Sequence, residues 1–225
     1  MSASITITKF EDFDLCFGDL GAKVGPRIGP NKRTQDQKEW YVVRRFLKEA
    51  ISARKFQLPA RVERGHPPDP DFLVVGNLMR ALIEITEATS EADQREMTLQ
   101  EYTNEPILLG DLGGRFRGGG GEPGHLWASD VVEAIERKKE KSIFSTKNVE
   151  RHLVIYPNSN ASFLIFNDED ERRAFALLAN LIDDKREELS RIVGECSVHI
   201  LGKKYIFFNV AAKAVRRRRR FTTVG

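Results

Sequence analysis

The chain has 225 residues, of which 40% are hydrophobic and 31% are charged, a composition that can bury one domain-sized core in water. No segment is apolar over the length that a membrane-spanning helix needs, and the N-terminus shows no secretory signal. Cys16 and Cys196 are the two cysteines, too few for a disulfide framework and wrongly spaced for zinc. We therefore expect reduced thiols and a cytoplasmic protein, and the net charge of +3 is too mild to single out a partner.

The N-terminal part of the chain alternates short apolar runs with one amphipathic segment. Residues 35–53 carry apolar side chains at spacings of three and four, which predicts a helix, and Thr34 or Asp36 can cap its start. The preceding stretch is rich in glycine and proline and predicts a loop through residue 30. Short apolar runs predict strands at residues 4–8, 61–64, 72–75 and 81–86.

The C-terminal part is predicted to begin with an irregular, glycine-rich insertion at residues 91–128. A helix is expected at residues 129–143, where Ser129 or Asp130 can cap its start, and a long amphipathic helix at residues 168–192. Further strands are expected in two hairpins, which pair residues 153–156 with 163–166 and residues 198–201 with 205–208.

These elements predict an α/β fold in which a central mixed sheet is flanked by helices. We expect one domain over residues 1–215, with a core at about residues 35–156, followed by a basic tail at residues 216–225. The tail begins with five consecutive arginines. Such a run either holds phosphates or forms a solvated terminus.

Two acidic residues stand out against this apolar background. Asp71 opens one predicted strand, and Glu84 interrupts the next, in the run Leu82-Ile83-Glu84-Ile85. A lone buried carboxylate is costly, and a divalent cation shared with Asp71 would offset that cost because hard cations take oxygen ligands. Two other interpretations stay open: Glu84 pairs with an arginine across the sheet, and Asp71 caps a turn in residues 67–70.

Two helices could add charged side chains to this pair of acids. Glu39 lies in register with the apolar face of the first predicted helix, so an acid points inward there. On the second predicted helix, a helical wheel places Lys139 on the apolar face, Lys138 at its edge and Lys141 on the outer face. A lysine at such an edge could stabilise charge on a phosphate, or it could simply extend along a solvated face.

A known motif resembles this arrangement. Pro70-Asp71, twelve further residues and then Glu84-Ile85-Thr86 resemble the PD-(D/E)xK motif of the restriction-endonuclease-like nucleases. The predicted order of helix, three strands, helix and strand over residues 35–156 resembles the common core of that superfamily. In this chain an additional C-terminal helix and hairpin would follow the core.

The resemblance implies roles for individual residues. Asp71 and Glu84 would bind Mg²⁺ (or Mn²⁺) together with the backbone carbonyl of Ile85, and Glu39 matches the acid that some members add from the helix. Thr86, however, stands where the family has its lysine.

The missing lysine has a candidate replacement later in the chain. Ile135-x-x-Lys138-x-x-Lys141 is similar to variants of the superfamily in which the lysine has moved to the following helix, and on this resemblance we assign its role to Lys138. The resemblance thus implies a metal-dependent nuclease that hydrolyses phosphodiester bonds of DNA, and RNA remains the alternative substrate.

The sequence also leaves a non-catalytic function open, because Thr86 replaces the motif lysine. In that alternative the chain is an inactive nuclease fold that binds nucleic acid or serves as an assembly subunit of a defence or phage system. Its partner would then be nucleic acid, another protein or a second copy of the chain, and we expect no membrane association.

Overall fold

A computed structural model describes residues 3–18, 34–89, 123–139, 149–157 and 168–201, together with the backbone of residues 205–209 and 215–217. The helices are α1 (Phe13–Cys16), α2 (Gln35–Ser52), α5 (Pro123–Glu136), α7 (Asp168–Asp184) and α8 (Arg186–Val193). The strands are β1 (Ser4–Ile7), β2 (Ala60–Arg64), β3 (Phe72–Gly76), β4 (Arg80–Ala88), β5 (Glu150–Pro157), β6 (Ser197–Leu201), β7 (Tyr205–Asn209) and β8 (Val215–Arg217).

The described strands form one mixed sheet in the order β1-β2-β3-β4-β5-β6-β7-β8. Strands β1 to β4 pair antiparallel, β4, β5 and β6 pair parallel, and β6, β7 and β8 pair antiparallel again. Parallel neighbours require a crossover, and α5 supplies one between β4 and β5 while α7 and α8 supply the next. The predicted α/β class and the mixed sheet flanked by helices are therefore confirmed.

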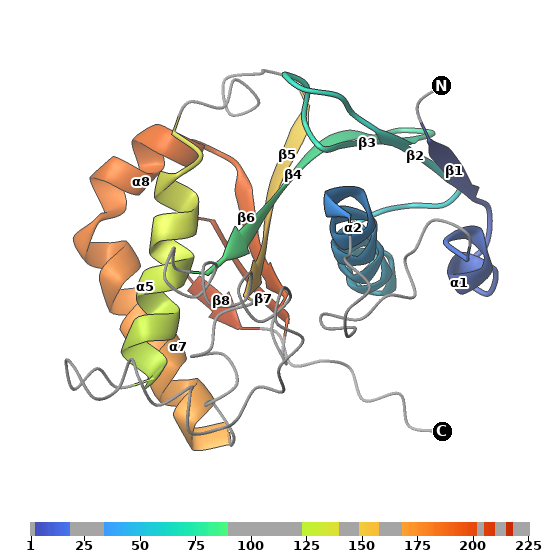
Figure 1. Ribbon diagram of the computed structural model, residues 1–225. Helices are drawn as coiled ribbons and strands as arrows, with labels where there is room; N and C mark the ends of the chain where they lie inside the picture. Colours follow the sequence, from blue (N-terminus) through green and yellow to red (C-terminus); the bar gives the residue numbers. More distant parts are fainter. Residues whose placement is uncertain are drawn as a thin grey trace, which may run out of the picture.

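Helices cover both faces of the sheet (Figure 1). The core on one face contains α2 residues, among them Trp40 and Phe46, and the core on the other face contains residues of α5, α7 and α8. A capping box fixes the start of α2, because the Thr34 hydroxyl accepts a hydrogen bond from the Gln37 N–H and the Gln37 side chain accepts one from the Thr34 N–H. Thr34 is thus the cap, as the sequence allowed.

Strand β4 runs between the two cores and exposes a different set of side chains to each. Ile83 and Ile85 belong to the core under α2, whereas Ala88 belongs to the core under α5. Because side chains alternate along a strand, Glu84 and Thr86 share the α5 face with Ala88. The acid that interrupts the apolar run therefore points toward the α5 layer.

The bounds of α5 differ from the prediction at both ends. The helix begins at Pro123, so the predicted insertion ends before it, and Ser129 and Asp130 lie inside the helix and do not cap it. The earlier start buries Trp127 and Ala128 in the α5-side core. The helix ends at Glu136, and residues 137–139 form a turn; residues 140–143 lie outside the described part.

Two further helix predictions were wrong. The predicted loop before residue 30 contains the short helix α1, which buries Phe13. The predicted helix 168–192 is two helices, α7 and α8, separated at Lys185. The Lys185 side chain turns toward α5, where its ammonium contacts the Glu136 carboxylate at 2.6 Å.

The strand predictions at the C-terminal end also need correction. Residues 163–166, predicted as the hairpin partner of β5, lie outside the described residues, and both edges of β5 at residues 152–155 are taken by β4 and β6. The arginine run was predicted as a tail. Its first two residues belong to the sheet, because Arg216 pairs with Phe207 and Arg217 with Ile206.

Candidate active site

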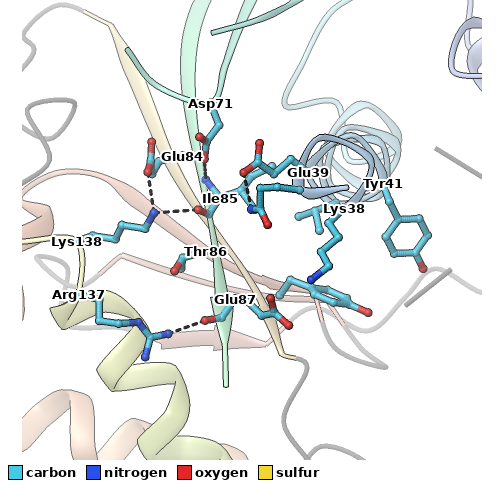
Figure 2. A pocket seen from close by; sticks show the side chains of 13 residues that line it. Lys38, Glu39, Tyr41, Asp71, Glu84, Ile85, Thr86, Glu87, Arg137 and Lys138 are labelled. Carbon is cyan, nitrogen blue, oxygen red and sulfur yellow. Dashed lines mark hydrogen bonds and ion pairs between the residues drawn. The ribbon is translucent and has the colours of Figure 1, made fainter. Parts of the chain in front are cut away.

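A cleft of about 390 Å³ brings together residues from α2, β4, β5, the position before β3 and the turn after α5 (Figure 2). The residues that the sequence singled out all line it: Glu39, Asp71, Glu84, Ile85 and Lys138. The other lining residues are Gln35, Lys38, Tyr41, Val42, Thr86, Glu87, Arg137 and Tyr156. The fold therefore gathers into one cleft residues as far apart in the chain as Gln35 and Tyr156.

Asp71 is fixed by hydrogen bonds that its carboxylate and its backbone carbonyl accept. Its Oδ2 accepts a hydrogen bond from the Ile85 N–H at 2.7 Å, and its carbonyl accepts one from the Gly65 N–H at 2.9 Å. The sequence left open that the Asp71 side chain caps a turn in residues 67–70. In the structure it is the Asp71 carbonyl that closes this loop, through its hydrogen bond from Gly65. Burial, and then the charge of Glu84, raise the pKa of Asp71 above its ordinary value.

Glu84 lies opposite the position of Asp71, because Phe72 pairs with Ile83 in the antiparallel register of β3 and β4. Its side chain is 0% exposed, and its Oε1 accepts a hydrogen bond from the Lys138 ammonium at 2.7 Å. The same ammonium donates to the Ile85 carbonyl at 3.0 Å. The cationic partner of Glu84 at this contact is therefore a lysine from the α5 side, and not the arginine across the sheet that the sequence left open.

Lys138 reaches β4 because α5 has already ended. The N–H groups of Lys138 and Lys139 bond to the carbonyls of Ile135 and Glu136, three residues back, at 3.0 and 3.2 Å. Such bonds tighten the last turn and rotate the following side chains away from their helical directions. Lys139 is exposed, and Lys138 turns inward with 16% of its side chain exposed, so the helical wheel misplaced Lys139.

Arg64, at the end of β2, contacts the acids on the α2 side of the cleft and was missed by the sequence analysis. Its guanidinium donates to the Asp71 carbonyl at 2.8 Å and to the Asp36 carboxylate at 3.0 Å, and it pairs with Glu39. It also lies over the Phe72 ring, 4.9 Å from the ring centroid. The sequence signal that could have identified Arg64 was a basic residue at the end of a strand, just before the loop that leads to Asp71.

Glu39 lines the cleft but is already engaged. The residue is 7% exposed, and its Oε1 accepts a hydrogen bond from the Gln35 side chain at 2.7 Å. Burial, and then the charge of Asp71, raise the pKa of Glu39. Because Arg64 holds the same carboxylate, Glu39 serves in this arrangement as an acceptor for Arg64, which also supports Asp71.

The donor atoms in the cleft fit a hard divalent cation. Asp71 and Glu84 offer carboxylate oxygens and Ile85 offers a carbonyl, and Mg²⁺ is commonly held by one or two carboxylates with water and substrate completing its shell. A positive group already bridges two of these oxygens, namely the Lys138 ammonium between Glu84 and Ile85. Among the described residues, no three His, Cys, Asp or Glu side chains form a group that could hold a metal. Any cation here would therefore need oxygens from backbone, water or substrate.

Cys196, His152 and His199 lie outside this cleft and are buried. Burial raises the pKa of the Cys196 thiol to about 12, which keeps it protonated at neutral pH. His152 and His199 contact each other at 3.0 Å beside the Phe46 ring. Burial and the neighbouring His152 hold the pKa of His199 well below its ordinary value. The two histidines therefore form a buried pair that packs against the core.

Comparison with known proteins identifies no relative: no family model, curated protein or solved structure matches the chain. Within the described ranges, no helix combines the length and the apolar character that crossing a bilayer requires. The chemistry of the cleft is therefore the basis for a functional assignment.

Proposed function

We propose that this protein is a Mg²⁺-dependent (or Mn²⁺-dependent) nuclease of the restriction-endonuclease-like type, acting on phosphodiester bonds of DNA, with RNA as the alternative substrate. One observation carries the proposal. The Lys138 ammonium lies 2.7 Å from Glu84 and 3.0 Å from the Ile85 carbonyl, while the Ile85 N–H holds Asp71 at 2.7 Å. These are the residues on which the motif resemblance rests, and they come together although Lys138 is distant in the sequence.

The proposed roles follow from the chemistry of each group. Asp71, Glu84 and the Ile85 carbonyl would hold the cation, which when bound would polarise the scissile phosphate and lower the pKa of an attacking water. Lys138 presents a positive charge beside Glu84, where it can stabilise the negative charge that develops on the phosphate. Arg64 keeps the Asp71 backbone in place through its hydrogen bond to the carbonyl.

The charge of the cleft supports a requirement for metal. Three basic and four acidic side chains line it, which gives a formal charge of −1 and repels a phosphate. One bound divalent cation changes the formal charge to +1. Binding of nucleic acid in this cleft should therefore depend on the metal as well as on the ionic strength.

A second function competes with catalysis, because Thr86 occupies the position of the family's lysine. Thr86 is buried and carries no charge, so a site without help from Lys138 would bind nucleic acid without cleaving it. The chain would then act as a nucleic-acid-binding or assembly subunit, with a protein partner or a second copy of itself.

Cleavage of labelled DNA with Mg²⁺ and with EDTA tests the proposal. We expect Asp71→Ala and Glu84→Ala to abolish Mg²⁺-dependent cleavage, and Lys138→Ala to lower turnover by roughly 10²-fold, the scale for loss of one charge-stabilising group. Asp69→Ala is the matched control, since Asp69 is an exposed acid in the same loop. Full activity in the variants of Asp71 or Glu84 would overturn the site. Salt-sensitive retention of DNA without cleavage in the wild-type protein would select the non-catalytic function.

A further inference from the structure

The cleft continues beyond the acidic residues toward the carboxyl end of β4, where its character changes. Tyr41 of α2 and Tyr156 of β5 line this outer part, with ring centroids 6.2 Å apart and planes at 83°. Both tyrosines are half-buried, so each ring is held by the protein yet remains accessible from the cleft. A ring held by an edge-on neighbour in this way offers a fixed face on which one planar base can stack.

Two cations border the same outer part of the cleft. Figure 2 shows Lys38 extending from α2 toward β4 and Arg137 approaching from the α5 side. Arg137 donates to the Glu87 carbonyl at 2.6 Å. Within the described residues, no carboxylate lies within ion-pair distance of the Lys38 ammonium. This ammonium, which no carboxylate of the described residues pairs, is placed to contact a phosphate.

The spacing along β4 suits a nucleotide a few steps from the acidic end of the cleft. Glu84 and Glu87 both line the cleft, and three residues of strand span roughly 10 Å at about 3.3 Å each. That length corresponds to about three base-stacking rises of 3.4 Å. A phosphate at the acidic end would therefore place a nucleotide up to about three steps along the strand within reach of the tyrosines.

We propose that this outer part is a nucleotide subsite, in which an unpaired base stacks on Tyr41, which Tyr156 braces through its T-shaped contact, while Lys38 and Arg137 hold the adjoining phosphate. The inference rests on the proposed nuclease function and names its substrate class: single-stranded nucleic acid or a frayed end. A base inside a duplex keeps its faces against its neighbours, so only an unpaired base can present a face to these rings.

Binding of a fluorescent single-stranded oligonucleotide tests the subsite. Phosphorothioate linkages slow its hydrolysis, and anisotropy in Mg²⁺ then reports the affinity of the full chain. We expect tighter binding of the single strand than of the matching duplex. Tyr41→Ala and Tyr156→Ala should each weaken single-strand binding about tenfold or more, the scale of one base–aromatic stacking contact.

Matched variants separate stacking from folding. Tyr41→Phe and Tyr156→Phe keep the ring and should bind within about twofold of the wild type. Tyr41→Leu keeps an apolar side chain against the core but removes the stacking face, so it should behave like the alanine variant even if that variant folds poorly. Wild-type affinity in a folded Tyr41→Leu variant, or an equal preference for duplex, would overturn the subsite.

The outcomes also distinguish this inference from the nuclease proposal. Tyrosine-dependent binding of single strands without Mg²⁺-dependent cleavage would support the subsite and refute the nuclease. If the Tyr41 and Tyr156 variants keep the wild-type affinity and the wild-type rate of Mg²⁺-dependent cleavage, the nuclease proposal is supported and the subsite is refuted.

Discussion

Lys138→Ala should destabilise the protein in the absence of metal and much less in its presence. The ammonium of Lys138 contacts Glu84 Oε1 at 2.7 Å and the Ile85 carbonyl at 3.0 Å. Glu84 is 0% exposed and Lys138 is 16% exposed. Removing the ammonium therefore leaves a carboxylate buried without this cation, and the carboxylate cannot turn to water.

The magnitude follows from the burial of the pair. Breaking a buried ion pair by removing one partner costs about 3–5 kcal/mol, and the partial exposure of Lys138 places this pair near the lower end. In a chain of this size, about 1 kcal/mol shifts the melting temperature by about 2–4 °C. We therefore expect the variant to melt roughly 6–12 °C below the wild type in EDTA.

Magnesium should reverse most of this loss. In our proposal the cation uses the same Glu84 and Ile85 oxygens that Lys138 contacts, so it supplies the missing positive charge. Ligand that binds only the folded state raises stability in proportion to the logarithm of its concentration over Kd. The melting temperature of the variant should accordingly rise more with Mg²⁺ than that of the wild type, where the ammonium competes for these oxygens.

Thermal melts in EDTA and in Mg²⁺ measure both effects, with Lys139→Ala as the control. Lys139 lies in the same turn but is exposed, so its removal should change the melting temperature little. Equal stability of the two variants in EDTA would show that the ammonium of Lys138 does not stabilise Glu84. An equal loss in EDTA and in Mg²⁺ would show that the metal does not reach these oxygens.

Two further predictions follow from the site and from the C-terminal arginines. Burial and the charge of Glu84 raise the folded-state pKa of Asp71 above 3.8, so its ionised form costs stability at neutral pH, and acidification through the raised pKa relieves that cost. Asp71→Asn should hence be at least as stable as the wild type in EDTA at pH 7 and should lose this advantage toward pH 4. Mg²⁺ should not raise the melting temperature of this variant. A variant less stable than the wild type at pH 7 would contradict the prediction. Deleting residues 218–225 removes three arginines while keeping β8. The slope of log K for DNA binding against the log of salt concentration should then become shallower by up to roughly 2–3 units. An unchanged slope would show that these arginines do not contact phosphate.

Sequence reasoning found the strands and the pair of acids because both depend on local patterns. Apolar runs bounded by turn residues marked β3 and β4, and Glu84 was visible as the acid inside one run. Adjacent strands joined by a short connection usually pair, so Asp71 and Glu84 could be expected side by side. The antiparallel register of β3 and β4 satisfies that expectation.

Long-range contacts were beyond the same reasoning. Arg64 contacts Asp36 and Glu39 on α2, and nothing in the local sequence of β2 indicates which helix packs above it. The helical wheel wrongly placed Lys139, and not Lys138, on the inward face for a related reason. A wheel assumes that the helix continues, whereas α5 ends at Glu136 and its last turn redirects both lysines.

The residue that fits the fold least well is also the one that indicates the site. A strand between two apolar cores is most stable with apolar side chains, and Glu84 breaks that rule at 0% exposure. The fold offsets the cost with an ammonium from another layer, and Arg64 likewise offsets Glu39, yet the pKa values of Asp71 and Glu39 remain raised by burial. Acids held together at such cost are difficult to explain as packing alone, and in the proposed site a divalent cation would lower the cost of the Asp71 and Glu84 charges.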